Sequence, residues 1–231
     1  MDWKSLRRRM ENWWLPPRCV LSGAPGEEFD LSLEQLQQLR CTQNMCPQCA
    51  GFSHESRLCG SCLAEGNAVD RSQVAWFFSG PLIELIHGLK YGNRYAYGRL
   101  LAELWAPKLQ ADGVELLLPV PIHPLRRRDR GYNQAEVLAR NLGSMLNIPV
   151  CSDALFRIRN TPSQTSLSAK QRQENLKTAF DVNAERLQGV RHIALVDDVI
   201  TTGATMRNLA LALRKSERIE TIQAWATAKT E

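Results

Sequence analysis

Two adjacent carboxylates, Asp197 and Asp198, stand at the centre of the segment ALVDDVITTGAT, residues 194–205. They follow an apolar run and precede a turn that carries two threonines and a glycine. Because neighbouring carboxylates repel each other, this placement requires a ligand with hydroxyl groups, or a cation, to offset the charge. A helix that begins after the turn would direct free backbone N–H groups and the positive end of its dipole at an anion. The segment therefore predicts a site for a sugar phosphate or for magnesium.

The acidic pair could also belong to a receiver domain, a nucleotide-binding loop or a simple capping turn. A receiver domain has acidic residues after a strand, but its doubly wound fold needs roughly a hundred further residues, and only 33 follow Asp198. The sequence has neither a G-x-x-x-x-G-K-[ST] nor a G-x-G-x-x-G motif, which excludes two common nucleotide-binding loops. A capping turn with solvated acids would explain Asp198 and Thr201 but not the whole segment, and it stays open as an alternative.

Cysteines predict a metal site near the N-terminus. Cys46-Pro-Gln-Cys49 and Cys59-Gly-Ser-Cys62 form two C-x-x-C motifs that are nine residues apart. This spacing lets two tight turns present four thiolates to zinc in a tetrahedron. Four thiolates leave no position for a water molecule, so the predicted zinc is structural. Two disulfides are the alternative, which a cytoplasmic location disfavours.

Two other cysteines in this region lack such partners. Ser22 occupies the position at which a second thiol would follow Cys19, and Cys41 is isolated. We interpret both as small buried apolar residues rather than as ligands of a second metal.

Length and composition are compatible with two units and a cytoplasmic location. The chain has 231 residues, and 29 Lys and Arg against 24 Asp and Glu give it a net charge of +5, which permits an anionic ligand without requiring nucleic acid. The N-terminus lacks the features of a signal peptide, and no apolar run approaches the roughly 18 residues of a membrane span. The cysteine-rich segment predicts a small unit at residues 1–72, followed by a larger domain at residues 73–231.

The larger domain shows alternating strand and helix patterns. Apolar runs predict strands at residues 74–78, 114–120, 192–196 and 219–227, and helical periodicity predicts helices at residues 82–89, 99–109, 134–146 and 204–214. This alternation indicates a parallel sheet, whose ligands bind beyond the carboxyl ends of the strands. A polar stretch at residues 159–173 predicts a loop that could close over the site.

Several segments resemble a known family. PVPIHPLRRRDRGYNQ, LIHGLKYGNR and RIRNTPSQTSLSAKQRQENLKTAF are similar to the competence protein F (ComF) family, and ALVDDVITTGAT resembles the phosphoribosyl pyrophosphate (PRPP) loop of type I phosphoribosyltransferases. The resemblance covers nearly the whole chain. It implies an α/β phosphoribosyltransferase-like parallel sheet flanked by helices, after an N-terminal double zinc ribbon of which only the second has all four cysteines here.

The resemblance also implies roles for residues. Asp197 and Asp198 would bind the ribose 2′ and 3′ hydroxyls of PRPP, which binds with magnesium. The segment after Pro121 would be the pyrophosphate loop, in which the guanidinium groups of Arg126 and Arg130 pair with phosphate oxygens. The 5′-phosphate would be surrounded by Thr201, Thr202, Gly203, Ala204 and Thr205, and Lys90 would add positive charge at the pyrophosphate.

Three neighbours of this segment have alternative roles. The arginines of the basic run could instead be a solvated turn or a nucleic-acid contact. At the start of the next helix, we interpret Asn133 as the helix cap, in preference to a role of Tyr132 as a base-stacking platform. We interpret His123 as a structural residue.

The sequence thus predicts displacement at C1′ of PRPP by an unidentified acceptor, linked by resemblance to DNA uptake. The competing hypothesis is a protein without turnover that senses PRPP or handles single-stranded DNA, with competence-machinery proteins as partners. No general base is visible, and fold alone cannot separate an enzyme from a binding protein.

Overall fold

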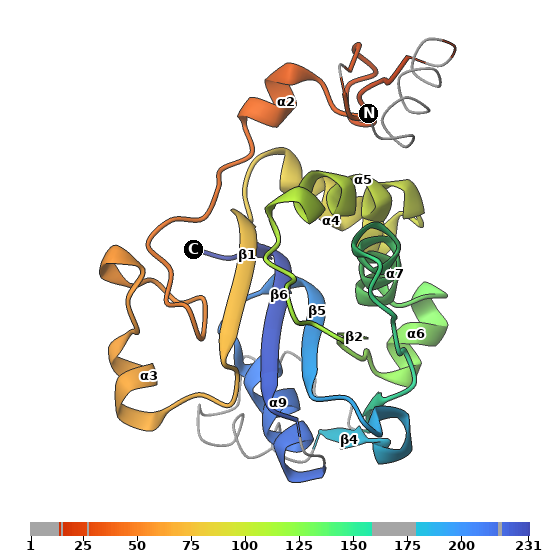
Figure 1. Cartoon of the computed structure of the whole chain (residues 1–231). Helices are drawn as coiled ribbons and strands as arrows, with labels where there is room; N and C mark the ends of the chain where they lie inside the picture. Colours follow the sequence, from red (N-terminus) through yellow and green to blue (C-terminus); the bar gives the residue numbers. More distant parts are fainter. Residues whose placement is uncertain (1–13, 15, 27, 159–178, 217–218) are drawn as a thin grey trace.

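The computed structural model describes residues 14, 16–26, 28–158, 179–216 and 219–231. In this part of the chain the central sheet has four parallel strands in the order β1-β6-β5-β2 (Figure 1). The strands are β1 Arg71–Phe77, β2 Leu116–Pro119, β5 His192–Ile200 and β6 Thr221–Lys229. Because all four run in the same direction, their carboxyl ends lie along one edge of the sheet, where parallel sheets bind ligands.

Helices pack on both faces of the sheet. The strands β5 and β6 are apolar on both sides, as expected for a buried parallel sheet. Ala194 and Val196 of β5 face a core that contains residues of α4 Pro81–Tyr91, α5 Tyr95–Trp105 and α7 Gln134–Leu146. Ile193 and Leu195 face the opposite core, formed with α9 Ala204–Ser216 and the hairpin of β3 Leu155–Arg157 and β4 Phe180–Val182. Residues 193–196 of β5 therefore alternate between the two layers.

Shorter elements complete the described part. The α-helices are α2 Leu33–Gln37, α3 Gly60–Glu65 and α6 Pro124–Arg130, and the 3-10 helices are η1 His54–Ser56, η2 Ala106–Lys108 and η3 Ala184–Leu187. No described helix has both the length and the apolar character that crossing a membrane requires.

The N-terminal segment covers the free edge of β1. Cys41 forms an antiparallel bridge with Trp76, and Phe77 N–H donates to the carbonyl of Arg40 at 2.8 Å. Ser72 N–H donates to the carbonyl of Pro47 at 2.6 Å, and α3 lies on the same side of the sheet (Figure 1). Such pairing protects an edge strand from pairing with other chains. The boundary between residues 72 and 73 stays a prediction, and it falls within β1.

The predicted mixed α/β fold with a parallel sheet is confirmed, with differences in detail. Helix α7 has the predicted bounds, whereas β5 continues four residues past the predicted end because it stays paired with β6 as far as Ile200 and Lys229. Asp197 and Asp198 therefore lie within the strand rather than after it. The predicted loop after Pro121 contains helix α6, which begins with Pro124 at a position suited to proline. The predicted loop at residues 159–173 lies outside the described residues.

Candidate functional site

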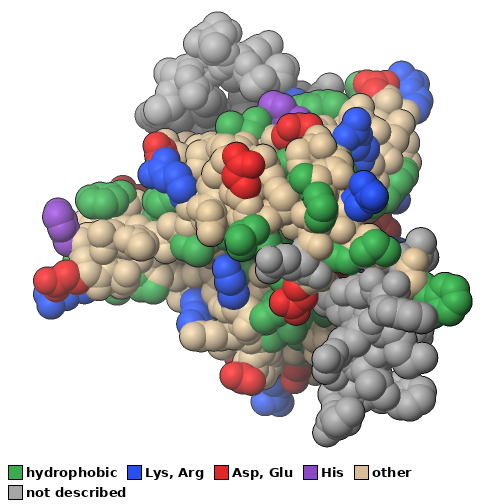
Figure 2. Space-filling model, turned by 90° about the horizontal axis from the view of Figure 1, so that it is seen from above, with side chains coloured by type: hydrophobic (Ala, Val, Ile, Leu, Met, Phe, Trp, Pro, Cys, Tyr) green, Lys and Arg blue, Asp and Glu red, His purple; other side chains and the backbone are tan. Residues whose placement is uncertain are grey.

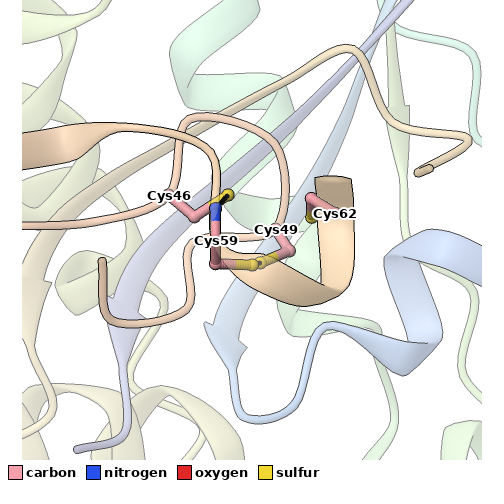
Figure 3. Close-up of side chains that lie close together, drawn as sticks. All are labelled: Cys46, Cys49, Cys59 and Cys62. Atoms are coloured by element: carbon pink, nitrogen blue, oxygen red, sulfur yellow. Dashed lines mark hydrogen bonds between the residues drawn. The ribbon is translucent and has the colours of Figure 1, made fainter. Parts of the chain in front are cut away.

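Four cysteines form a cluster beside the sheet. The Sγ atoms of Cys46, Cys49, Cys59 and Cys62 all lie within 4.8 Å of one another and point toward a common centre (Figure 3). Zn–S bonds of about 2.3 Å in a tetrahedron separate sulfur atoms by about 3.8 Å, and Cys49 Sγ lies 3.6 Å from Cys59 Sγ. The cluster thus fits a structural zinc ion in an N-terminal ribbon.

Local backbone structure presents these thiols. In the first motif, Ala50 N–H donates to the carbonyl of Cys46 at 3.0 Å, which closes a tight turn. In the second, Cys59 precedes α3, and its N–H donates to Cys46 Sγ at 3.4 Å. Burial and the neighbouring thiols raise the pKa of Cys62. Burial also raises the pKa of Cys46, but hydrogen bonds from backbone amides outweigh it and lower this pKa to about 6. A divalent cation would allow all four groups to be thiolates at once.

The remaining N-terminal cysteines do not join a cluster. Cys19 is buried, as predicted, but Cys41 is exposed, so the prediction that it is buried is wrong. Its position in the segment that pairs with β1 leaves its side chain at the surface. Among the described residues, neither belongs to a group of three or more potential metal ligands.

Asp198 is the more buried member of the acidic pair. Its side chain is on the face of α4 and α7, where Lys90 Nζ lies 2.6 Å from Oδ2 and Gln134 Nε2 donates to Oδ1 at 3.5 Å. The side chain of Lys90 is 21% exposed and that of Asp198 is 3% exposed, so this ion pair is largely removed from water. Lys90, predicted beside the pyrophosphate, thus contacts Asp198 directly.

Asp197 is on the opposite face and in a different electrostatic environment. Its Oδ1 accepts a hydrogen bond from Asp198 N–H at 2.8 Å. Burial and the negative charge of Asp198 raise the pKa of Asp197 well above its usual value, against the opposing effect of Lys90. Strongly shifted carboxyl groups at the end of a strand are typical of functional sites.

The turn that follows β5 exposes polar groups at the N-terminus of α9. Thr201 and Thr202 are exposed, and Thr205 is partly exposed. Gly203 has a φ of 75°, a left-handed conformation that favours glycine. Helix α9 begins at Ala204, whose N–H donates to Thr202 Oγ1 at 3.4 Å.

Helix α6 presents its arginines in two ways. Arg126 is exposed, while Arg130 is partly buried, donates to Gln134 Oε1 at 2.5 Å and lies 5.0 Å from the centre of the Tyr91 ring. Gln134 therefore connects Arg130 with Asp198. The structure thereby brings together three predicted site residues, Lys90, Arg130 and Asp198.

Comparisons with known proteins identify the family. None of the protein-family models compared with the sequence matches it. Competence protein F of Haemophilus influenzae is 35% identical over 193 residues, which cover 80% of this chain and 84% of that protein. The chain belongs to the competence protein F family. The DNA utilization protein YhgH of Escherichia coli K12 is 33% identical over 83% of this chain and 86% of that protein. Competence protein ComFC of Bacillus subtilis is 22% identical over 83% of this chain and 80% of that protein.

This ComF-family site includes two cations that the sequence analysis missed. Burial and the positive charge of Arg126 lower the pKa of Arg157, at the end of β3, while Asp197 raises it, so Arg157 interacts electrostatically with both. Lys229, at the end of β6, donates to the carbonyl of Thr201 at 2.6 Å. Lys229 lies two residues past the predicted strand at 219–227, and nothing in the sequence links it to Thr201.

Three residues near the ends of α6 and α7 make structural contacts in this ComF-family protein. Asn133 Oδ1 accepts from Ala135 N–H at 3.1 Å and caps α7, as expected. Tyr132 is buried and its hydroxyl donates to the carbonyl of Leu89, so the alternative of base stacking by Tyr132 is wrong. His123 caps α6 by accepting from Leu125 N–H at 3.3 Å.

Replacing Lys90 with methionine is expected to lower the free energy of unfolding by about 3 to 5 kcal/mol, because it leaves Asp198 buried without its cation. Urea denaturation measures this change. Arg191→Met is the matched control, since Arg191 pairs with Glu220 at 3.1 Å and both side chains are exposed; this replacement should cost less than about 1 kcal/mol. Equal losses in the two variants would contradict a dominant role for the Lys90 pair.

Proposed function

We propose that this ComF-family protein binds PRPP with magnesium at the carboxyl ends of β5 and β2 and transfers its phosphoribosyl group to an acceptor, in the uptake or use of DNA. The observation that supports this most is the order of polar groups along the end of β5 and the turn that follows it. A carboxyl group with a raised pKa, Asp197, is followed within a few residues by exposed hydroxyls at the start of α9. A ligand with both ribose hydroxyls and a phosphate matches this order.

Each part of PRPP has complementary groups in the proposal. Asp197 and Asp198 accept hydrogen bonds from the ribose hydroxyls, and Lys90 orients Asp198 and adds positive charge at the pyrophosphate. The 5′-phosphate accepts hydrogen bonds from the backbone and hydroxyl groups of residues 201–205 at the helix N-terminus. Arg126 and Arg130 bind the pyrophosphate.

The mechanism that follows is displacement of pyrophosphate at C1′. Positive groups that are held in place by the fold stabilise the negative charge that develops on the leaving group. Magnesium, bound with PRPP, would offset part of the same charge, and carboxylates and phosphates are the ligands it prefers. Arg130 is suited to this role because its contacts with Gln134 and Tyr91 fix its side chain before the ligand binds.

Calorimetric titration with PRPP and magnesium tests binding, with ribose 5-phosphate and pyrophosphate as partial ligands. We expect both partial ligands to bind more weakly than PRPP, because each occupies one part of the site. Pyrophosphate release in the presence of a panel of nucleobases separates transfer from binding alone. No binding of PRPP to the zinc-loaded protein would refute the proposal.

A second candidate function is the handling of single-stranded DNA. Tyr91 and Tyr95 are 71% and 51% exposed, and Arg130 stacks on Tyr91. Exposed aromatic rings beside cations are typical of surfaces on which bases stack. Over the described residues of the face shown in Figure 2, however, positive and negative side chains are interspersed rather than gathered in a basic groove.

Substitutions on α6 separate these two functions. Arg126→Ala and Arg130→Ala are each expected to weaken PRPP binding about tenfold to a hundredfold, the effect of losing one charge-assisted hydrogen bond. Arg128→Ala is the control, because Arg128 is exposed on the same helix and is not assigned to the site. If the two variants instead bind PRPP normally and single-stranded DNA weakly, with a salt dependence reduced by about 0.7 per lost contact, DNA handling is favoured.

A further inference from the structure

The zinc ribbon contacts the turn to which we assign the phosphate. A Cβ atom at Gly203 would lie 3.3 Å from the carbonyl oxygen of Cys49, which is a predicted zinc ligand. This distance is short for a Cβ contact, so the left-handed φ of Gly203 and its close approach to the ribbon both favour glycine. The first C-x-x-C turn and the turn after β5 therefore pack backbone against backbone, although more than 150 residues separate them in the sequence.

Lys229 holds the turn after β5 against the end of β6. Its Nζ donates to the carbonyl of Thr201 at 2.6 Å.

Further contacts hold the ribbon against the domain. The carbonyls of Pro47 and Gln48, which lie between Cys46 and Cys49, accept hydrogen bonds from the backbone and the side chain of Ser72 in β1. Glu65, at the end of α3, lies 3.5 Å from Arg207 in the first turns of α9. The first C-x-x-C turn is therefore attached to β1 and faces the turn after β5, and α3 is attached to α9.

We infer that the zinc centre is a support for the turn of Thr201, Thr202 and Gly203, so that zinc binding and anion binding at this turn strengthen each other. The anion part rests on the proposed function. Without a cation, four close thiols cannot all be charged. The C-x-x-C turns that carry them therefore depend on metal binding for their stability. Loss of zinc then releases the carbonyl of Cys49 from Gly203, and the exposed turn loses one side of its packing. By linkage, an anion bound at the turn favours zinc by the same factor as zinc favours the anion.

Hydrogen exchange tests the support without a ligand. In the full chain, the backbone amides of residues 201–204 are expected to exchange at least about fivefold faster after zinc removal, which is the lower range of typical couplings between sites. Amides of α5 and α7 serve as the internal control, because neither helix includes a zinc ligand or a residue of the turn. Unchanged exchange of the turn, with these helices protected, would overturn the inference.

Gly203→Ala tests the contact without replacing a zinc ligand. We expect it to lower zinc affinity, measured by competition with a chromophoric chelator, by about fivefold or more. Gly113→Ala is the matched control, because Gly113 also has a left-handed φ, 76°, but nothing lies within 4 Å of a Cβ placed there. Equal zinc affinities in the two variants would overturn the inference even if zinc removal unfolds the chain.

Binding of PRPP with magnesium to zinc-loaded and zinc-depleted protein then tests the anion. A roughly five- to 150-fold weaker affinity without zinc is expected. If zinc-loaded protein does not bind PRPP, the proposed function fails, while the exchange and chelator measurements still decide whether the ribbon supports the turn.

Discussion

Cys62→Ser is expected to reduce the zinc content of the protein from one ion per chain to none and to unfold the segment around the four cysteines. Cys62 is buried at the start of α3, and its thiol is one of four ligands that surround the predicted ion. Binding of structural zinc is worth about 10 to 16 kcal/mol in zinc-finger peptides. Few apolar contacts could replace that contribution, because the segment is too small for its own core. Metal analysis of protein purified under reducing conditions measures the loss.

Cys41→Ser is the control for this experiment. Cys41 lies in the same N-terminal region but is exposed and outside the cluster, so its replacement should leave one zinc ion per chain. Cys49→Ser should behave like Cys62→Ser. A parent protein with no zinc would refute the site, and one with two zinc ions would show that Cys19 and Cys41 bind metal after all.

Periodicity in the sequence was sufficient for most of the fold. The apolar positions of residues 134–146 predicted α7 without error, because a helix with one buried face repeats its pattern over several turns. The end of β5 was harder to predict, since Asp197 and Asp198 interrupt the apolar run while their backbone remains paired with β6. Polar side chains at a ligand-binding strand end hide the strand from a pattern of hydrophobicity. For α6, the run of arginines has no apolar face that could indicate a helix.

The resemblance placed Lys90, Arg126 and Arg130 in one site with Asp197 and Asp198, but contacts between individual residues were predicted only where the residues are close in the sequence. The C-x-x-C motifs have a spacing that is specific for a metal site, and the four thiols do converge. In contrast, the ion pair of Lys90 with Asp198 and the contact of Gly203 with Cys49 join segments more than 100 residues apart. Such contacts depend on the order of strands in the sheet, which periodicity does not determine.

Asp197→Asn is expected to weaken PRPP binding by about tenfold to a hundredfold, through the loss of a charge-assisted hydrogen bond to the ribose. It is also expected to raise the free energy of unfolding of the ligand-free protein at neutral pH. Burial and the charge of Asp198 raise the pKa of Asp197, so ionising this carboxyl group destabilises the folded state. An asparagine has nearly the same shape without that charge. Opposite changes in affinity and stability are typical of a residue that is retained for function.

The effect of Asp197→Asn on the free energy of unfolding is expected to depend on pH. Because the pKa of Asp197 is higher in the folded than in the unfolded state, the folded state binds more protons between the two values, and stability falls as pH rises through that window. The stability gained by Asp197→Asn should therefore be small near the ordinary carboxyl pKa of about 4 and grow toward neutral pH, as measured by urea denaturation at several pH values.

Asp153→Asn is the control of opposite sign, because hydrogen bonding from Cys151 and the charge of Arg186 lower the pKa of Asp153. It should reduce stability slightly at neutral pH and leave PRPP binding unchanged. If Asp197→Asn binds PRPP as tightly as the parent, Asp197 does not contact the ribose; the alternative of a solvated capping turn is already excluded, because both aspartates lie within β5 and Asp198 is buried.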